Sequence, residues 1–488
     1  MLLVPALQGV WDLRTQFMFE AAVFLTGGFW IFREIMSGRP PAFLSDKRNI
    51  PLLCAAAFSY AAFRLSPVSS LIAPEWWNLL TGMFVLVFAS SLTLAERKSA
   101  DLALRLAAWC VVLLSFYQGY MIVVKGVGGA ADLTASLPTA NALALFTLML
   151  IPLAVVWRDI LLLAALLIVL IWTMSVPAVL GLLAGACFYA ADNISRGEVK
   201  KNRLVLAVLA VAAAAAVSLL EPRFVSDRLS WWDPAFRMFS DRPLLGFGQG
   251  AFAHVYPAFY HSGPALPAAA GAHNYYLEFL AENGLFAFLF CGWAALVRLK
   301  GIKGLEKYAL ISALVYSFTD FGLAAPANFF IFCYLLSVSR PGEAAAAAPA
   351  LRPDKKTAAV LAALGLACFA VLCGSFSSQF KLSRLRGRAL SDLYAGNYQR
   401  AEAVLAEAAR LAPADPLVPG LLGRVRLRAG SEQNDTGLLF SAAVELERSV
   451  TLVPYNAGAW LDLERLYAAA GERRLLEGLQ QRKAEVYK

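Results

Sequence analysis

The fold class is decided by Ile160-Leu-Leu-Leu-Ala-Ala-Leu-Leu-Ile-Val-Leu-Ile-Trp-Thr-Met-Ser175-Val-Pro177-Ala-Val-Leu-Gly-Leu-Leu-Ala-Gly-Ala-Cys-Phe-Tyr-Ala-Ala191. A helix needs about 20 apolar residues to cross a hydrocarbon core of about 30 Å, so this run is too long for one span. Ser175 and Pro177 supply a break in its middle, because proline removes a backbone donor and clashes with the preceding turn. The stretch therefore predicts two consecutive membrane helices.

The rest of the chain has the same character. Hydrophobic residues make up 59% and charged residues 16%, and the mean hydropathy is +0.60. Such a composition belongs in a bilayer. The net charge of +9 does not indicate nucleic-acid binding, because Lys and Arg are dispersed between apolar runs. We predict an all-α, polytopic membrane protein with about twelve transmembrane helices, at 15–32, 50–63, 76–95, 102–124, 138–157, 160–174, 176–191, 204–220, 274–297, 308–322, 323–339 and 357–374.

The basic residues orient this path. Along it, twenty Lys and Arg fall on one side of the membrane and seven on the other, before the tail begins. By the positive-inside rule the first side is cytoplasmic. The loop 221–273 and the C-terminal tail are therefore expected on the side of the membrane that faces away from the cytoplasm.

All three histidines, His254, His261 and His273, fall in that loop. Their spacing matches no usual zinc-ligand set and no cysteine is near, so we expect no metal. His254 and His261 are best interpreted as ordinary polar residues. His273 directly precedes the expected helix 274–297, and the positive end of that helix disfavours an imidazolium ring. A neutral ring there can act as a general base.

The loop also carries Arg228, Arg237 and Arg242, and guanidinium groups suit bidentate recognition of phosphate. Each has an alternative interpretation, Arg228 as a structural ion-pair partner and the other two as solvated charges. Gly246, Gly248 and Gly250 predict a turn whose backbone N–H groups could face an anion. No flanking βαβ unit is visible, so this is not a nucleotide fingerprint.

Three carboxylates lie in the predicted membrane helices nearby. Glu278 and Glu282 share a helix face, and a carboxylate in a membrane is costly unless it is paired. We expect both to hold loop arginines. We expect Asp320 to border the same cavity.

We divide the chain into a membrane core at 1–340, a linker with the final membrane helix at 341–384, and a helical domain outside the membrane at 385–488. Within the last, the spacing of Gly396, Tyr398, Ala401, Leu405, Ala408 and Pro413 fits a tetratricopeptide repeat. Two further, degenerate matches start near Gly437 and Trp460. Such stacked helix pairs form a concave surface for a protein partner, although an unrelated helical bundle is the alternative.

The loop and the helix after it resemble the membrane O-antigen ligase and polymerase superfamily. The residues that carry the resemblance are Arg228-x-x-Trp231, Ala235, Met238, Asp241-x-Pro243-x-x-Gly246-x-Gly248-x-Gly250-x-Phe252 and Ala272-His273-Asn274-x-x-Leu277-x-x-Leu280-x-Glu282-x-Gly284. Two segments that flank this region are also similar to the superfamily, namely Ser136-Leu-Pro-Thr-Ala-Asn141-Ala and Ser317-x-x-Asp320-x-x-x-x-x-Pro326-Ala-Asn328. Periplasmic tetratricopeptide repeats also occur in this superfamily. The resemblance implies a bacterial inner-membrane protein whose loop 221–273 and C-terminal domain are periplasmic.

The resemblance implies transfer of a glycan from an undecaprenyl-diphosphate carrier to an acceptor, without a metal or other cofactor. It implies His273 as the base and Arg228 as the group that holds the leaving diphosphate. Further site residues expected on this basis are Arg237, Arg242, Gly246, Gly248, Asn274, Glu282 and Asp320. The acceptor, whether glycan, lipid or protein, sets the reaction: O-antigen ligation in lipopolysaccharide biosynthesis, polymerisation of repeat units, or protein O-oligosaccharyl transfer.

The sequence departs from the family pattern at two positions. Family members often carry Ser-Arg-Gly between two central helices, where this chain has Ser175-Val176-Pro177. Tyr316 stands where a histidine is frequent. A non-catalytic scaffold or a polysaccharide transporter is the alternative of a different class, and a relay of charges along several helices would favour transport.

Overall fold

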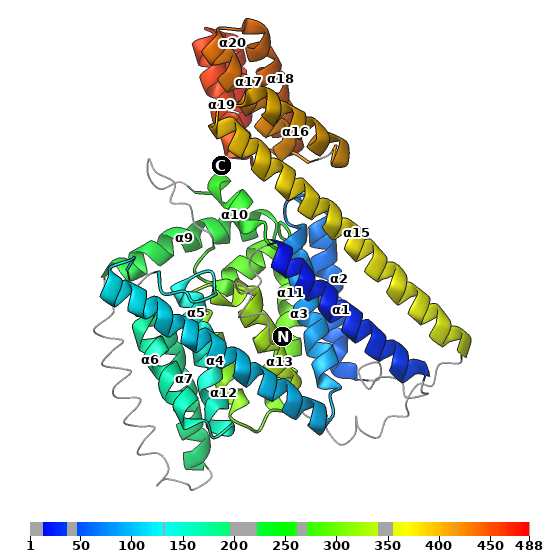
Figure 1. The fold of residues 1–488 in the computed structure, drawn as a ribbon, viewed down its shortest axis with the longest axis vertical. Coiled ribbons are helices and arrows are strands. Elements are labelled where there is room, and N and C mark those ends of the chain that lie inside the picture. Colours follow the sequence, from blue (N-terminus) through cyan, green and yellow to red (C-terminus); the bar gives the residue numbers. More distant parts are fainter. Residues whose placement is uncertain are drawn as a thin grey trace.

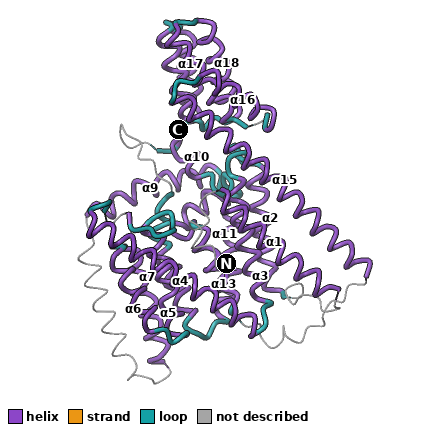
Figure 2. Tube along the Cα trace, in the orientation of Figure 1, coloured by secondary structure: helices purple, strands orange, loops and turns teal. Residues whose placement is uncertain are grey.

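A computed structural model describes residues 13–36, 46–129, 132–195, 222–260, 271–339, 355–413 and 415–487. These residues form helices joined by turns and contain no strand, which confirms the all-α prediction for this part of the chain (Figure 2). The helices are α1 Leu13–Met36, α2 Ile50–Arg64, α3 Ala73–Ser90, α4 Leu94–Lys125, α5 Ala140–Val156, α6 Ile160–Trp172, α7 Val176–Ser195, α9 Pro222–Asp241, α10 Phe252–Val255, α11 Tyr275–Lys300, α12 Glu306–Tyr316, α13 Pro326–Ser337, α15 Lys355–Tyr394, α16 Tyr398–Leu411, α17 Leu417–Gln433, α18 Thr436–Leu452, α19 Ala457–Ala469 and α20 Arg473–Val486.

Among the described residues, three helices are long and apolar enough to cross a membrane, namely α4, α7 and α11. Shorter apolar helices are α5, α6 and α13. The expected span at 204–220 lies outside the described residues. The total of about twelve spans and the orientation of the chain therefore stay predictions.

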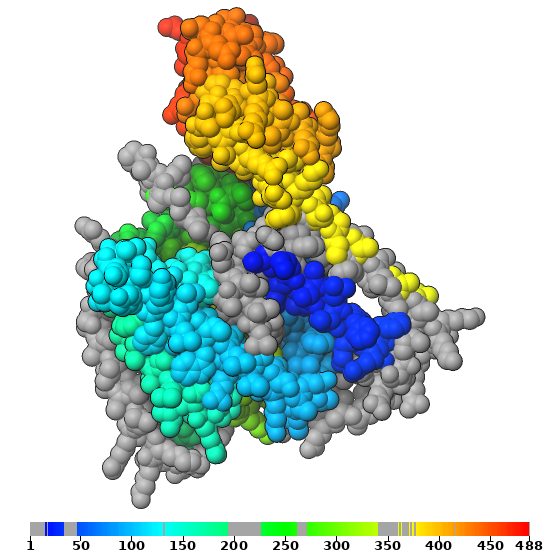
Figure 3. All heavy atoms as spheres, viewed as in Figure 1, coloured from blue at the N-terminus to red at the C-terminus, as the bar shows by residue number. Residues whose placement is uncertain are grey.

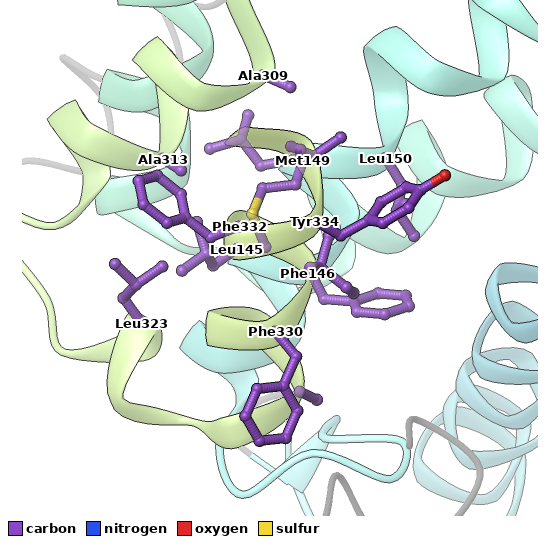
Figure 4. Close-up of a cluster of buried hydrophobic side chains, with 14 of the residues drawn as sticks. Leu145, Phe146, Met149, Leu150, Ala309, Ala313, Leu323, Phe330, Phe332 and Tyr334 are labelled. Atoms are coloured by element: carbon purple, nitrogen blue, oxygen red, sulfur yellow. The ribbon is translucent and has the colours of Figure 1, made fainter. Parts of the chain in front are cut away.

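Helix α5 lies at the centre of the bundle and packs against α6, α7, α12 and α13. Nearly every α5 side chain is buried, which explains why its sequence is apolar all round rather than amphipathic. Figure 4 shows Phe146 and Met149 of α5 in one buried cluster with Ala313 of α12 and Phe332 of α13. This packing fixes Asn141, in the first turn of α5, at one end of the bundle.

The break predicted between 160 and 191 is present. Helix α6 ends at Trp172 and α7 begins at Val176, with Met174 between them in a left-handed conformation (φ 49°). The break brings Ser175 beside α5, where its hydroxyl donates to Asn141 Oδ1 at 2.8 Å.

The segment 221–273 was expected to be a loop, and this was wrong for its first part. Residues Pro222–Asp241 form α9, which Figure 1 shows lying across one end of the bundle. Its inner face carries Arg228, Trp231, Ala235 and Met238, spaced by three and four residues as on one side of a helix. Ala235 and Met238 are fully buried. The family motif over this segment is therefore one stripe of a helix.

Helix α11 is interrupted at Gly284, whose backbone has φ 71° and ψ 178°. The interruption diverts the amide of Leu285 to the carbonyl of Pro243, at 2.8 Å. The carbonyls of Ala281 and Glu282 in turn accept from Phe247 and Gly248. The segment Pro243–Gly248 is thus clipped into the gap in α11 by backbone hydrogen bonds.

Helix α15 runs for 40 residues, through the boundary that the sequence placed between 384 and 385. In Figure 1 it is the long yellow helix that ends in the tail domain, defined here as residues 385–487. The tail helices pack in chain order, each against the next. Ala401, Leu405 and Ala408, three of the expected repeat positions, are completely buried in it.

The tail domain packs against the segment that follows α9 (Figure 3). Val453, between α18 and α19, is buried in one cluster with Phe247 and Phe252. The ring of Tyr455 meets Phe247 edge-on, with centroids 6.1 Å apart. The tail therefore packs directly on the segment clipped to α11.

Candidate active site

His273 lies at the same end of the bundle as Asn141. Its Nδ1 is 3.1 Å from Oδ2 of Asp320. The His273 side chain is 23% exposed, whereas that of Asp320 is 1% exposed. With the proton on Nδ1 the ring donates to the buried carboxylate, and Nε2 is left as the basic nitrogen.

Asp320 is held from several directions. Asn141 Nδ2 donates to Oδ2 at 2.8 Å. The amide of Gly322 donates to Oδ1 at 2.9 Å, and the Tyr316 hydroxyl lies 2.9 Å from the same atom. This set of hydrogen bonds fixes the position of the Asp320 carboxyl group opposite His273.

Two aromatic rings fix the orientation of the imidazole. Trp231 of α9 stacks on it, with centroids 4.4 Å apart and planes 26° apart. Phe321 meets it edge-on at 4.8 Å. His273 itself has φ 48°, a left-handed conformation that costs a non-glycine residue roughly 1–2 kcal/mol. Strain of this kind is characteristic of functional positions.

Arg228 reaches the same place from α9, one turn before Trp231. Its Nε donates to the carbonyl of Thr319, the residue before Asp320, at 2.9 Å. Partial burial lowers the pKa of Arg228, and the charge of Asp320 acts in the opposite direction. Arginine stays protonated through such a shift, so a permanent positive charge lies beside the His273–Asp320 pair.

The other two loop arginines lie elsewhere. Arg237 forms an exposed ion pair with Asp233 on α9, at 2.8 Å. Arg242 lies over the ring of Phe247 at 4.7 Å and donates to the carbonyl of Leu65. Their contacts match the alternative interpretation of Arg237 as a solvated charge and give Arg242 a packing role.

The glycines of the expected anion turn have positive φ angles, at 69° for Gly246, 99° for Gly248 and 86° for Gly250. Their amides are committed to protein acceptors, since Gly246 donates to the Arg242 carbonyl and Gly248 to that of Glu282. The glycines thus let the segment dock closely on α11. The expectation that the amides of Gly246 and Gly248 face an anion does not fit this arrangement.

Asn274 caps α11, because its side-chain oxygen accepts from the amides of Tyr276 and Leu277 at 3.1 Å each. This cap explains why the helix starts immediately after His273.

The pairing expected for Glu278 and Glu282 was wrong. In the described part of the chain their hydrogen-bond donors are not arginines. Glu278 accepts from the amide of Ala272 at 2.8 Å. Glu282 accepts from the amide of Phe252 and from Gln249 Nε2. Both carboxylates hold the polypeptide that leads to His273.

The remaining histidines do not join this site in the described residues. His254 lies on the one-turn helix α10, and His261 lies outside the described residues. Within the described ranges, no group of three or more His, Cys, Asp or Glu side chains is placed to hold a metal ion.

One of the two departures from the family pattern, Tyr316, lies in the network around Asp320. Tyr316 places its hydroxyl 2.7 Å from the carbonyl of Asn141, as well as near the carboxylate. Ser175 extends the chain of hydrogen bonds through Asn141. Val176 is buried at the start of α7 and offers no charge.

Sequence reasoning did not assign roles to Trp231, Phe321 or Tyr316 beside His273. The spacing Arg228-x-x-Trp231 carried a usable signal, because residues three apart share a helix face. The contact of Phe321 and Tyr316 with the site depends on how α12 packs, which no local pattern records.

A comparison with protein families bears on this geometry. Residues 161–291 match the O-antigen ligase family model. The match spans α6 to the middle of α11 and so contains Arg228, Trp231 and His273. No curated protein matches the chain.

The O-antigen ligase match supports the superfamily expected from the sequence. It supports, in general terms, a membrane enzyme that transfers glycans, with a glycan–lipid donor and an acceptor. Asp320 and Asn141 lie outside the matched range, and the structure brings both to His273.

Proposed function

We propose that this protein is a metal-independent glycosyltransferase of the O-antigen ligase type. It transfers an oligosaccharide from a polyprenyl-diphosphate carrier to an acceptor hydroxyl at the periplasmic face of the inner membrane. The observation that carries the proposal is the imidazole of His273 bonded to a buried carboxylate and bordered by Arg228.

In this mechanism Nε2 of His273 takes the proton of the acceptor hydroxyl. The acceptor oxygen bonds to the anomeric carbon of the donor while the bond from that carbon to the diphosphate oxygen breaks. Asp320 stabilises the imidazolium that forms and keeps the proton on Nδ1 from moving. Attack from the face opposite the leaving group inverts the anomeric configuration.

Arg228 stabilises the leaving diphosphate. A fixed cation aimed at developing negative charge lowers the barrier without reorganisation at the moment of reaction. With Val176 in the family arginine's place, Arg228 carries more of this task than its counterparts do. Its attachment to Thr319 ties its position to that of Asp320.

The location of the polar groups favours an enzyme over a transporter. His273, Asp320, Asn141, Ser175 and Arg228 gather at one end of the bundle, and α5 below them is apolar. A transporter needs polar groups distributed along the path of its substrate.

The tail domain, on this proposal, is a periplasmic tetratricopeptide-like module that holds a protein partner or the acceptor. Its support is the burial of the expected repeat positions and its packing on the segment clipped to α11.

The proposal is tested in cells that lack the gene. Lipid-linked glycan should accumulate there, and the unsubstituted gene should clear it while His273→Ala does not, at equal membrane abundance. Purified protein should transfer glycan in the presence of EDTA. Clearance by the His273→Ala variant, or loss of transfer with EDTA, would refute the mechanism.

A further inference from the structure

A polar cavity of about 300 Å³ lies between α3, α10 and α11. Its walls include Glu75, Asn78, Gln249, Glu278 and Glu282. Phe321 lines it as well and meets the His273 ring edge-on. Phe321 thus borders both the cavity and the candidate base. Its volume falls within the range of about 300–1,000 Å³ that is typical of small-molecule sites.

The lining of the cavity differs from the Arg228 side. Three carboxyl groups line it, and no Lys or Arg is among its described lining residues. A phosphate in this cavity would find no cation to pair with among those residues, and an unpaired buried charge is costly. Hydroxyl and ammonium groups, by contrast, donate to carboxylates.

The cavity also holds polar atoms that lack a protein partner. Glu278 is 7% exposed and uses one oxygen for the amide of Ala272. Its other oxygen has no hydrogen-bond donor among the described residues. The side-chain oxygen of Asn78 is buried with no donor in the same part of the chain. Buried acceptors of this kind ordinarily have a partner, so a ligand rich in hydroxyl groups would satisfy them.

We infer that this cavity binds the acceptor sugar, as a pyranose ring that carries hydroxyl or amino groups and no phosphate. The inference rests on the proposed function, because it assigns the donor and the acceptor of that reaction to different sides of His273. The diphosphate of the donor lies on the side of Arg228. The acceptor lies on the side of Glu75, with its reacting hydroxyl directed past Phe321 to Nε2.

An apolar cavity adjoins this polar one. Leu79, Tyr275, Leu323 and Phe329 also line an apolar cavity of about 160 Å³ between α2, α3, α11 and α13. A sugar that carries a hydrocarbon chain would occupy both, and we therefore expect alkyl glycosides to bind more tightly than methyl glycosides.

A cysteine reporter tests the inference without requiring turnover. Ala253 lines the cavity and is exposed, so Ala253→Cys, in full-length protein in lipid nanodiscs, places a thiol at its mouth. Labelling of this thiol by N-ethylmaleimide is followed by mass spectrometry of its peptide. The probes are methyl and octyl glycosides of glucose, galactose, mannose and glucosamine, with glucose 1-phosphate as the charged comparison.

At a sugar concentration about ten times Kd, labelling should slow about tenfold, because only the unoccupied fraction reacts. Glucose 1-phosphate should give no protection, and Glu75→Gln should weaken protection by the glycosides. Ser240→Cys on α9, away from the cavity, is the matched control and should label at one rate throughout. Ala324→Cys on the opposite wall replaces the reporter if Ala253→Cys does not fold.

The inference is overturned if no glycoside protects either reporter, or if glucose 1-phosphate protects as well as they do. Protection without glycan transfer would keep the cavity as a sugar site and remove the proposed reaction. Glycan transfer without protection would keep the proposed reaction and remove the cavity as the acceptor site.

Discussion

At the scale of single residues, the position of His273 depends on neighbours from three separate parts of the chain. Trp231, Asp320 and Phe321 contact its ring, and Asn141 holds Asp320. On the proposed mechanism, Asp320 is the group that sets the tautomer of His273.

Asp320→Asn should reduce glycan transfer by roughly 10²- to 10⁴-fold, because an amide neither stabilises the imidazolium nor enforces the proton on Nδ1. Transfer rates of purified protein measure this. Tyr316→Phe is the matched control, since it removes one hydrogen bond to the same carboxylate and should cost much less. Equal losses from the two variants would contradict the role given to Asp320.

Arg228→Lys keeps the charge and loses the planar donor set and the bond from Nε to Thr319. We expect transfer to fall about 10- to 100-fold, in line with roughly 1.5–3 kcal/mol for a hydrogen bond to a charged group. Arg237→Lys on the exposed face of α9 should change little. Rates measured over a range of donor concentrations compare the pair, and a similar loss from both would count against Arg228 as the diphosphate ligand.

At the scale of elements, the interruption of α11 positions the site. Gly284 needs its left-handed backbone, and a Cβ there would collide with the backbone of Leu244. Gly284→Ala should therefore destabilise the docking of Pro243–Gly248 on α11 by at least about 1–2 kcal/mol. The thermal midpoint in detergent should fall as a result. Gly292→Ala in the same helix meets no atom within 4 Å and is the control. Equal thermal midpoints for Gly284→Ala and Gly292→Ala would contradict the role given to the backbone hydrogen bonds between Pro243–Gly248 and α11.

The sequence predicted some elements and not others for physical reasons. The break at Ser175 and the helix start at Asn274 follow from local chemistry, and both were visible. Helix α9 was missed because Pro234 and the charged residues obscured the apolar stripe from Trp231 to Met238. The clip at Gly284 was not predictable, because it forms between two segments that lie far apart in the sequence.

The same division holds in the candidate site. His273 and Arg228 stood out by residue type and motif. The partners of Glu278 and Glu282 are backbone amides of the docked segment, and amides carry no sequence signal. The acidic cavity exists only once α1, α3, α10 and α11 are packed together.

At the scale of the whole molecule, the tail domain and the site share a boundary at Phe247. Tyr455→Ala removes an aromatic contact of roughly 0.5–1.5 kcal/mol across it. We expect faster hydrogen exchange in residues 243–259 and slower glycan transfer, with intact membrane insertion. Tyr394→Ala, which changes an exposed side chain of the tail, should alter neither the hydrogen exchange of residues 243–259 nor the rate of glycan transfer. Unchanged exchange in Tyr455→Ala would show that the tail does not support the segment.

The central claim of the account is that His273 is the base of a metal-independent glycan transfer. The most direct measurement compares purified protein with His273→Asn, a residue that tolerates the left-handed backbone found at this position. Transfer from a polyprenyl-diphosphate glycan should fall by roughly 10²- to 10⁴-fold, with an unchanged thermal midpoint. Transfer by His273→Asn at the rate of the unsubstituted protein would contradict the claim.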